Sequence, residues 1–88
     1  MIEDIILYEL RPDAMTAKEV ATQVGTWPIH SAPSTARIVS CLRQLRRFGL
    51  VDGGYGAFDD TASTFWLTSR GATRAEAFLA RGRFHDLR

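Results

Sequence analysis

The sequence predicts a single, mainly helical domain with one small β-hairpin, its elements in the order helix, helix, helix, strand, strand, helix. Apolar residues recur at helical spacing in four separate segments. Residues 53–63 carry three glycines and a polar end, as the loop of a hairpin does. A chain of 88 residues has room for little more than one small core, so we take residues 1–88 as one domain.

The first predicted helix covers the first ten residues and stops at Pro12. Its apolar stripe consists of Ile2, Ile5, Ile6 and Leu10. Leu7 and Tyr8 lie off this stripe and leave the helix apolar nearly all round, which is typical of a helix that is deeply buried or covered by a partner. We therefore place a dimer interface at Leu7, Tyr8 and Phe78. The alternative for these residues is an internal helix pair within one subunit.

The second helix begins at a capping box, in which the Thr16 hydroxyl accepts from free backbone N–H groups and Glu19 reaches back. Its buried face consists of Ala17, Val20, Ala21 and Val24. We expect Gly25 to end it in the left-handed conformation. The connection 26–33 contains two prolines, and we expect Trp27 and Ile29 to be its inward anchors.

The third helix runs from about Ser34 to Phe48. Its predicted buried stripe consists of Ile38, Cys41, Leu42, Leu45 and Phe48. Its opposite, exposed face consists of Ala36, Ser40, Arg43, Gln44 and Arg47, with Arg37 at one margin and Val39 and Arg46 at the other. Gly49 ends this helix and Leu50 starts a strand.

The hairpin returns through Phe65, Trp66 and Leu67, and Thr68 caps a last helix over about 69–81, which Gly82 ends. The apolar stripe of this helix consists of Ala72, Ala75, Phe78 and Leu79. Its other side carries Arg70, Arg74 and Arg81.

The small net charge of +1 conceals two basic segments. Residues 34–47 hold four arginines and no acidic residue, and residues 70–88 hold five arginines against Glu76 and Asp86. Local basic faces, rather than the net charge, are what attract a phosphate backbone. The alternative is an ordinary solvated helix face.

Other classes of function find no support in the sequence. Cys41 is the only cysteine, so no disulfide forms within the chain and the cytoplasm is the expected compartment. With His30 and His85 it makes too few soft ligands for a structural zinc site. No apolar run approaches the about 20 residues that cross a bilayer. We find no catalytic motif, so we expect no enzyme, no cofactor, no metal and no membrane partner.

The order of elements and the residues that separate them resemble the winged helix-turn-helix family, especially small bacterial or phage regulators of the MarR, PadR and ArsR kinds. Residues 16–25 (TAKEVATQVG) resemble the short second helix of that family. Residues 34–51 (STARIVSCLRQLRRFGLV) resemble its recognition helix, running into L-x-x-L-x-x-x-G-L-V. Residues 65–71 (FWLTSRG) resemble the Y-x-L-T-x-x-G that follows the wing. The likeness covers roughly residues 2–82.

The resemblance implies a sequence-specific transcriptional regulator that binds double-stranded DNA as a homodimer, with helix 34–48 in the major groove and a wing over about 50–67. Arginine suits this role, because its planar fork pairs with the acceptors on base edges. The implied DNA contacts are Ser34, Thr35, Arg37, Ser40, Arg43, Gln44 and Arg47.

Two features depart from the family pattern. The connection before the third helix is longer than usual, and the wing loop carries Asp59 and Asp60 without a basic residue, which argues against a phosphate contact there. The alternative function is a winged-helix protein-interaction module that does not bind DNA, for instance a phage-encoded modifier of a host complex. A weaker alternative is a ligand-responsive repressor with a pocket near Trp27.

Overall fold

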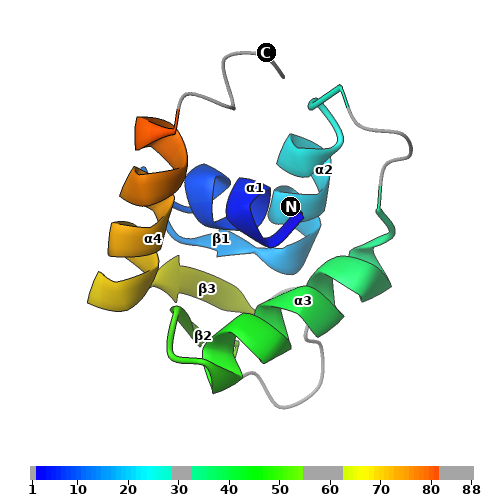
Figure 1. Ribbon diagram of the computed structural model, residues 1–88. Helices are drawn as coiled ribbons and strands as arrows, with labels where there is room; N and C mark the ends of the chain where they lie inside the picture. Colours follow the sequence, from blue (N-terminus) through cyan, green and yellow to red (C-terminus); the bar gives the residue numbers. More distant parts are fainter. Residues whose placement is uncertain (1, 29–32, 55–62, 82–88) are drawn as a thin grey trace.

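Four helices and three short strands form the part of the chain that the computed structural model describes, residues 2–28, 33–54 and 63–81 (Figure 1). In chain order the elements are α1 (Ile2–Glu9), β1 (Met15–Thr16), α2 (Ala17–Val24), α3 (Thr35–Arg47), β2 (Val51–Gly53), β3 (Thr64–Leu67) and α4 (Ser69–Ala80). The mainly helical class and the order of the helices are as predicted. The expectations for Ile29, the loop residues 55–62 and Gly82 lie outside the described residues.

The sheet has one strand more than the sequence predicted. Strand β3 is central and pairs antiparallel with β2 on one side and with β1 on the other. In the missed strand, Met15 pairs with Phe65 and Thr16 pairs with Thr64. Two residues are too few to show the alternation by which a strand is recognised in a sequence. The predicted hairpin therefore supplies two of the three strands of a small sheet that lies beside the helices.

Helix α1 lies at the centre of the molecule, between α4 and α2 (Figure 1). The side chain of Leu7 is fully buried and that of Phe78 on α4 is 3 % exposed. Neither side chain offers surface to a second copy, so the dimer interface predicted at these residues is wrong. The internal helix pair is what the structure shows, because a small domain needs all-round burial of its central helix to form a core.

Tyr8, the third residue of that predicted interface, is half-buried against the rest of the same chain. Its ring meets Trp27 edge-on, with centroids 5.4 Å apart, and the Arg11 guanidinium carbon lies 4.6 Å from the Tyr8 ring centroid. Trp27 is buried and its Nε1 donates to Glu9 Oε1 at 3.1 Å. The predicted inward anchoring of Trp27 is thereby confirmed.

The predicted capping box at the start of α2 is present. The Glu19 N–H donates to Thr16 Oγ1 at 3.1 Å, and the Thr16 N–H donates to Glu19 Oε1 at 2.9 Å. The end of α2 differs from the prediction, because Gly25 has a φ of −64° and is right-handed. Its N–H donates to Ala21 O, so the chain leaves the helix through a continued turn that any residue can adopt.

The junction between α3, β2 and α4 explains the glycines and the threonine that the sequence singles out. Gly49 ends α3 with a φ of +77°. Thr68 Oγ1 donates to Gly49 O at 2.6 Å and accepts from the Gly71 N–H at 3.2 Å. A Cβ on Gly71 would collide with the carbonyl oxygen of Leu50. The first turn of α4 therefore packs directly on the backbone that joins α3 to the sheet, and this fixes α3 relative to the hairpin.

Candidate functional site

Helix α3 is the most strongly amphipathic element that bears several basic residues. Ser34 is its N-cap, with Oγ accepting from the Arg37 N–H at 3.1 Å. The buried stripe consists of Ile38, Val39, Leu42 and Leu45. Arg46 and Arg47 lie in its last turn, where a positive charge is favourable beside the free carbonyl groups. The helix thus turns one face to the core and leaves the other for solvent or a partner.

The opposite face of α3 brings together four of the predicted contact residues. These are Ser40, Arg43, Gln44 and Arg47, all exposed, and they surround a shallow hollow of about 210 Å³. Their spacing of three, four and seven residues places them on one side of a helix. We call this set the outer face of α3. It presents hydroxyl, amide and guanidinium groups, which can all hydrogen-bond to base edges or phosphate oxygens.

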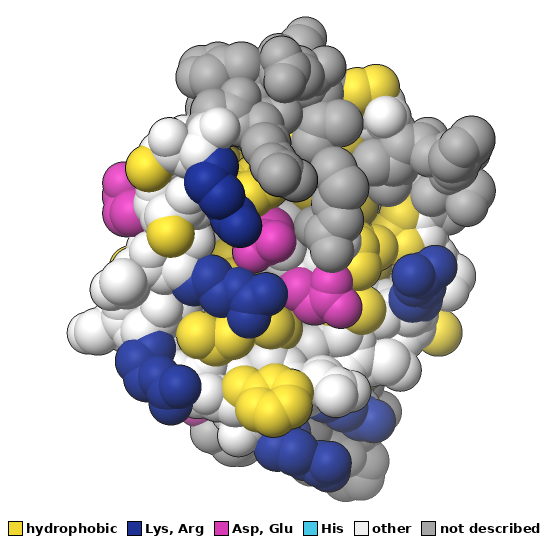
Figure 2. Space-filling model, viewed as in Figure 1, with side chains coloured by type: hydrophobic (Ala, Val, Ile, Leu, Met, Phe, Trp, Pro, Cys, Tyr) yellow, Lys and Arg dark blue, Asp and Glu magenta, His cyan; other side chains and the backbone are white. Residues whose placement is uncertain are grey.

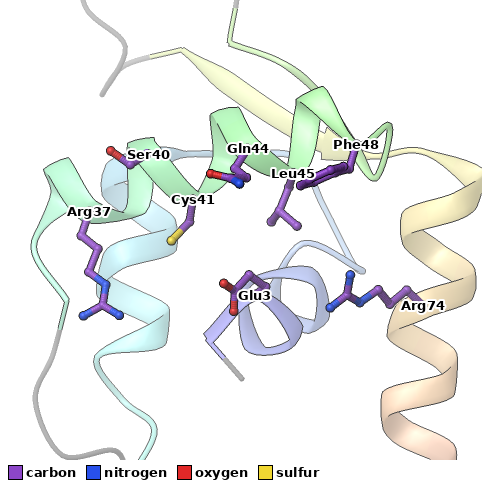
Figure 3. A pocket seen from close by; sticks show the side chains of 8 residues that line it. All are labelled: Glu3, Arg37, Ser40, Cys41, Gln44, Leu45, Phe48 and Arg74. Atoms are coloured by element: carbon purple, nitrogen blue, oxygen red, sulfur yellow. The ribbon is translucent and has the colours of Figure 1, made fainter.

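The other three predicted contacts lie at the edge of this face or away from it. The Ser34 hydroxyl oxygen accepts within the N-cap, and Thr35 is half-buried. Arg37 is exposed and, together with Ser40 and Gln44, lines a second cleft on the flank of the helix (Figure 3). Of the described residues, Ser40 and Gln44 thus line both hollows, whereas Arg43 and Arg47 line the one on the outer face.

That second cleft lies between α3, α1 and α4 and has a volume of about 500 Å³. It is lined by Glu3, Arg37, Ser40, Cys41, Gln44, Leu45, Phe48 and Arg74, whose arrangement Figure 3 shows. Phe48 is 57 % exposed at its rim, so its predicted place in the buried stripe of α3 is wrong. The helix ends at Arg47 and Phe48 is its C-cap, where the chain has already left the helical register that the stripe assumes.

Two groups in this cleft have shifted pKa values. A hydrogen bond from its own backbone N–H lowers the pKa of the Glu3 carboxyl, against the smaller opposing effect of partial burial. Partial burial raises the pKa of the Cys41 thiol. The cleft therefore holds an anionic carboxylate and a neutral thiol at neutral pH. No sequence pattern joins Glu3 to Arg74, because only the packing of α1 and α4 brings them to α3.

Val39 and Arg46, which the sequence places at the margin of the exposed face, both turn inward. Val39 is 8 % exposed. Arg46 is half-buried, and its Nη1 donates to Gly53 O at 2.7 Å and to Gly54 O at 3.1 Å. The sequence offered one signal for this: Arg46 follows Val39 by seven residues and Leu42 by four, on the core side of the helix.

Two arginines of the second basic segment, residues 70–88, interact with an acidic residue of the same chain. Arg74 Nε donates to Asp4 Oδ1 at 3.2 Å, and Arg81 Nη2 lies 4.0 Å from Asp4 Oδ2. Figure 2 shows acidic side chains among the basic ones in the middle of the face that it views. The basic residues of α4 and of α3 therefore differ in setting, although their number in the sequence is similar.

Comparison with known proteins identifies the fold. No family model matches the chain, and no curated protein matches it. Several solved structures are similar to it. Adhesin competence repressor AdcR from Streptococcus pyogenes matches with a TM-score of 0.72, 17% identity and coverage of 94% of this chain and 57% of that one. A mutant of ZitR from Lactococcus lactis matches with a TM-score of 0.70, 17% identity and coverage of 92% and 51%. PadR from Bacillus subtilis, in complex with operator DNA, matches with a TM-score of 0.70, 14% identity and coverage of 90% and 46%.

The chain has the winged helix-turn-helix fold that its sequence resembles, with α2 and α3 as the helix-turn-helix and β2–β3 as the wing strands. The chain spans about half the length of these similar proteins. None of the helices in the described ranges is long and apolar enough to cross a membrane.

Proposed function

We propose that this protein is a DNA-binding transcriptional regulator that places α3 in the major groove. The observation that carries the proposal is the outer face of α3, where Ser40, Arg43, Gln44 and Arg47 converge opposite the buried stripe. A helix fits the width of the major groove, and recognition helices read base edges from such a face.

The residues of the outer face suit different chemical groups of DNA. Arg43 can pair through two N–H groups with the O6 and N7 acceptors of guanine, and Gln44 can do the same with adenine N6 and N7. Ser40 reaches either kind of edge. Arg47 lies one turn after Arg43, towards the end of the helix, and is better placed for a phosphate. At the start of α3, free backbone N–H groups beside Ser34 and Thr35 favour a phosphate oxygen.

The shared fold supports this proposal. AdcR is described as a repressor, and the PadR structure contains operator DNA. We further propose that two copies act together in the cytoplasm of a bacterium or of a phage-infected cell, because two recognition helices can then read half-sites about 34 Å apart. The surface that joins the two copies is not the one predicted from the sequence, since Leu7 and Phe78 are buried within each chain.

The alternative, a winged helix that binds another protein, is favoured by one feature. Phe48 and Trp66 are 57 % and 44 % exposed, and aromatic side chains are enriched at the centres of protein interfaces. Phe48 lies at the rim of the cleft beside α3. A protein-binding surface there would use the flank of the helix with Ser40 and Gln44, and would leave out Arg43 and Arg47.

The experiment that tests the DNA proposal is selection of duplexes from a random pool, followed by fluorescence anisotropy on the selected sequence. Arg43→Ala should weaken binding by about 1–3 kcal/mol, roughly five- to 150-fold, if it pairs with a base. Arg81→Ala is the matched control, because it removes the same charge from an exposed site, the C-cap of α4. Equal effects of the two substitutions, or no binding by the folded wild type at low salt, would contradict the proposal.

A further inference from the structure

Three arginines occupy the last turns of α3, and one of them differs from the others in its burial. Arg43 and Arg47 are exposed on the outer face, whereas Arg46 is half-buried on the side of the sheet. The Arg46 Nη1 nitrogen donates to two successive carbonyl oxygens, those of Gly53 at 2.7 Å and Gly54 at 3.1 Å. We call this contact the Arg46 bridge.

The acceptors of the Arg46 bridge lie where β2 ends and the wing connection begins. Gly53 and Gly54 have φ values of +99° and +73°, which residues with a side chain rarely adopt. A Cβ on Gly53 would collide with Thr64 O, and a Cβ on Gly54 would collide with the Phe65 ring. The Gly54 N–H donates to Thr64 O at 2.8 Å. Only a glycine pair therefore gives the backbone this path, in which two carbonyl groups face one guanidinium.

A guanidinium suits such a bridge better than a lysine ammonium. The two N–H groups of Nη1 lie in a rigid plane and can point at two carbonyl oxygens at once, whereas the N–H groups of an ammonium rotate. Hydrogen bonds from a charged donor are stronger than those between neutral groups, and partial burial shields them from water. The same contacts occupy donors that an arginine on the outer face would offer to a phosphate.

We infer that Arg46 is a positioning residue, which holds the wing strands against the helix that enters the groove and makes no contact with DNA itself. The consequence of this bridge for DNA binding rests on the proposed function. If the protein binds DNA, the outer face of α3 and the end of β2 approach the duplex as one rigid unit. Loss of the bridge would leave the outer face chemically intact but less firmly held against the end of β2, although the junction around Gly49 still joins α3 to the sheet.

The test compares Arg46→Met with Arg47→Met, which remove the same charge from neighbouring positions and keep an apolar stem. In the free proteins, ¹⁵N NMR should show shifted Gly53 and Gly54 amide signals for Arg46→Met and nearly unchanged ones for Arg47→Met. With DNA, Arg46→Met should lower the affinity on the order of fivefold, at the lower end of usual coupling between two parts of a protein. Its salt dependence should match that of the wild type.

Arg47→Met should instead lower the slope of log K against log salt by about 1, as the loss of one phosphate contact does. A similar drop in slope for Arg46→Met would overturn the inference, because Arg46 would then be a phosphate contact. Unchanged Gly53 and Gly54 signals would overturn the bridge, whatever the DNA result. Absence of DNA binding by the wild type would overturn the proposed function alone, since the amide signals are read in the free protein.

A second variant guards against a loss of folding. Arg46→Lys keeps the charge and the stem, and its rotating ammonium replaces the two fixed N–H groups of Nη1. It should give Gly53 and Gly54 signals between those of the wild type and Arg46→Met, with the wild-type salt slope. Signals identical to those of Arg46→Met would contradict a bridge made by hydrogen bonds from a cation.

Discussion

The guanidinium of Arg74 donates from Nε to Asp4 Oδ1 at 3.2 Å, across 70 positions of the chain. This pair ties the first turn of α1 to the middle of α4, and Arg81 lies 4.0 Å from the other oxygen of the same carboxylate. One acidic residue thus engages an arginine in the middle of α4 and the arginine at its C-cap. The consequence is that charge on α4 serves the fold, whereas the outer face of α3 remains turned to solvent.

The Asp4–Arg74 pair should contribute little to stability. The Arg74 side chain is 47% exposed and that of Asp4 is 16% exposed, so water and salt weaken their attraction. A double-mutant cycle with Asp4→Ala and Arg74→Ala, measured by urea denaturation, should give a coupling free energy of about 0.2–1 kcal/mol. This coupling should shrink at high salt. A coupling well above this range that salt does not change would mean that the pair is desolvated.

Gly71→Ala should destabilise the fold, although alanine is normally the better residue in a helix. The new Cβ would collide with the carbonyl oxygen of Leu50, so α4 or the start of β2 must shift. Overpacking of this kind costs about 1–3 kcal/mol in the free energy of unfolding. Thr73→Ala on the exposed side of the same helix is the control and should be neutral or slightly stabilising. Stabilisation by Gly71→Ala would show that α4 does not approach Leu50 so closely.

Phe48→Ala and Leu42→Ala should differ sharply, although both residues belong to the apolar stripe that the sequence predicts. Leu42 is fully buried, and its truncation should cost about 2–5 kcal/mol in the free energy of unfolding. Phe48 is 57 % exposed, and its truncation should cost less than about 1 kcal/mol, as surface substitutions do. Urea denaturation of the two variants measures this difference. Equal losses would place Phe48 in the core.

Cys41 should react slowly with alkylating reagents at neutral pH. Partial burial raises the pKa of its thiol, so the folded protein holds less of the reactive thiolate than an unfolded chain does at the same pH. The rate of carboxamidomethylation should therefore lie below that of a small thiol at pH 7. It should rise as the pH approaches the raised pKa, and unfolding in urea should abolish the difference. A folded-state rate above that of the small thiol would contradict the direction of the shift.

The helices were predictable because each depends on residues close together in sequence. The Thr16 capping box and the Gly49 turn are local signals, and the buried stripe of α3 repeats along one element. The features that escaped prediction depend on contacts between distant segments. Strand β1 exists only because β3 pairs with it, and only the packing of α4 decides that the second apolar side of α1 is covered within the chain and not by a second copy.

The outer face of α3 was predictable for the same reason as its stripe, since the two are complementary sides of one helix. The orientation of the side chains at the two margins of this face was not predictable. Arg46 turns inward because two glycine carbonyls, seven and eight residues further along the chain, face it. Arg37 belongs to a cleft whose other walls are α1 and α4. Helical spacing alone does not specify what lies beside a helix, and the side chains at the edges of a face depend on it.

The most direct test of the central claim is an NMR titration of the folded protein with its selected duplex. If the outer face of α3 enters the major groove, the largest amide changes should map to Ser40, Arg43, Gln44 and Arg47, while the end of α4 near Arg81 stays unchanged. Changes confined to the residues that line the cleft, with Arg43 and Arg47 unaffected, or no change at any duplex concentration, would contradict the claim.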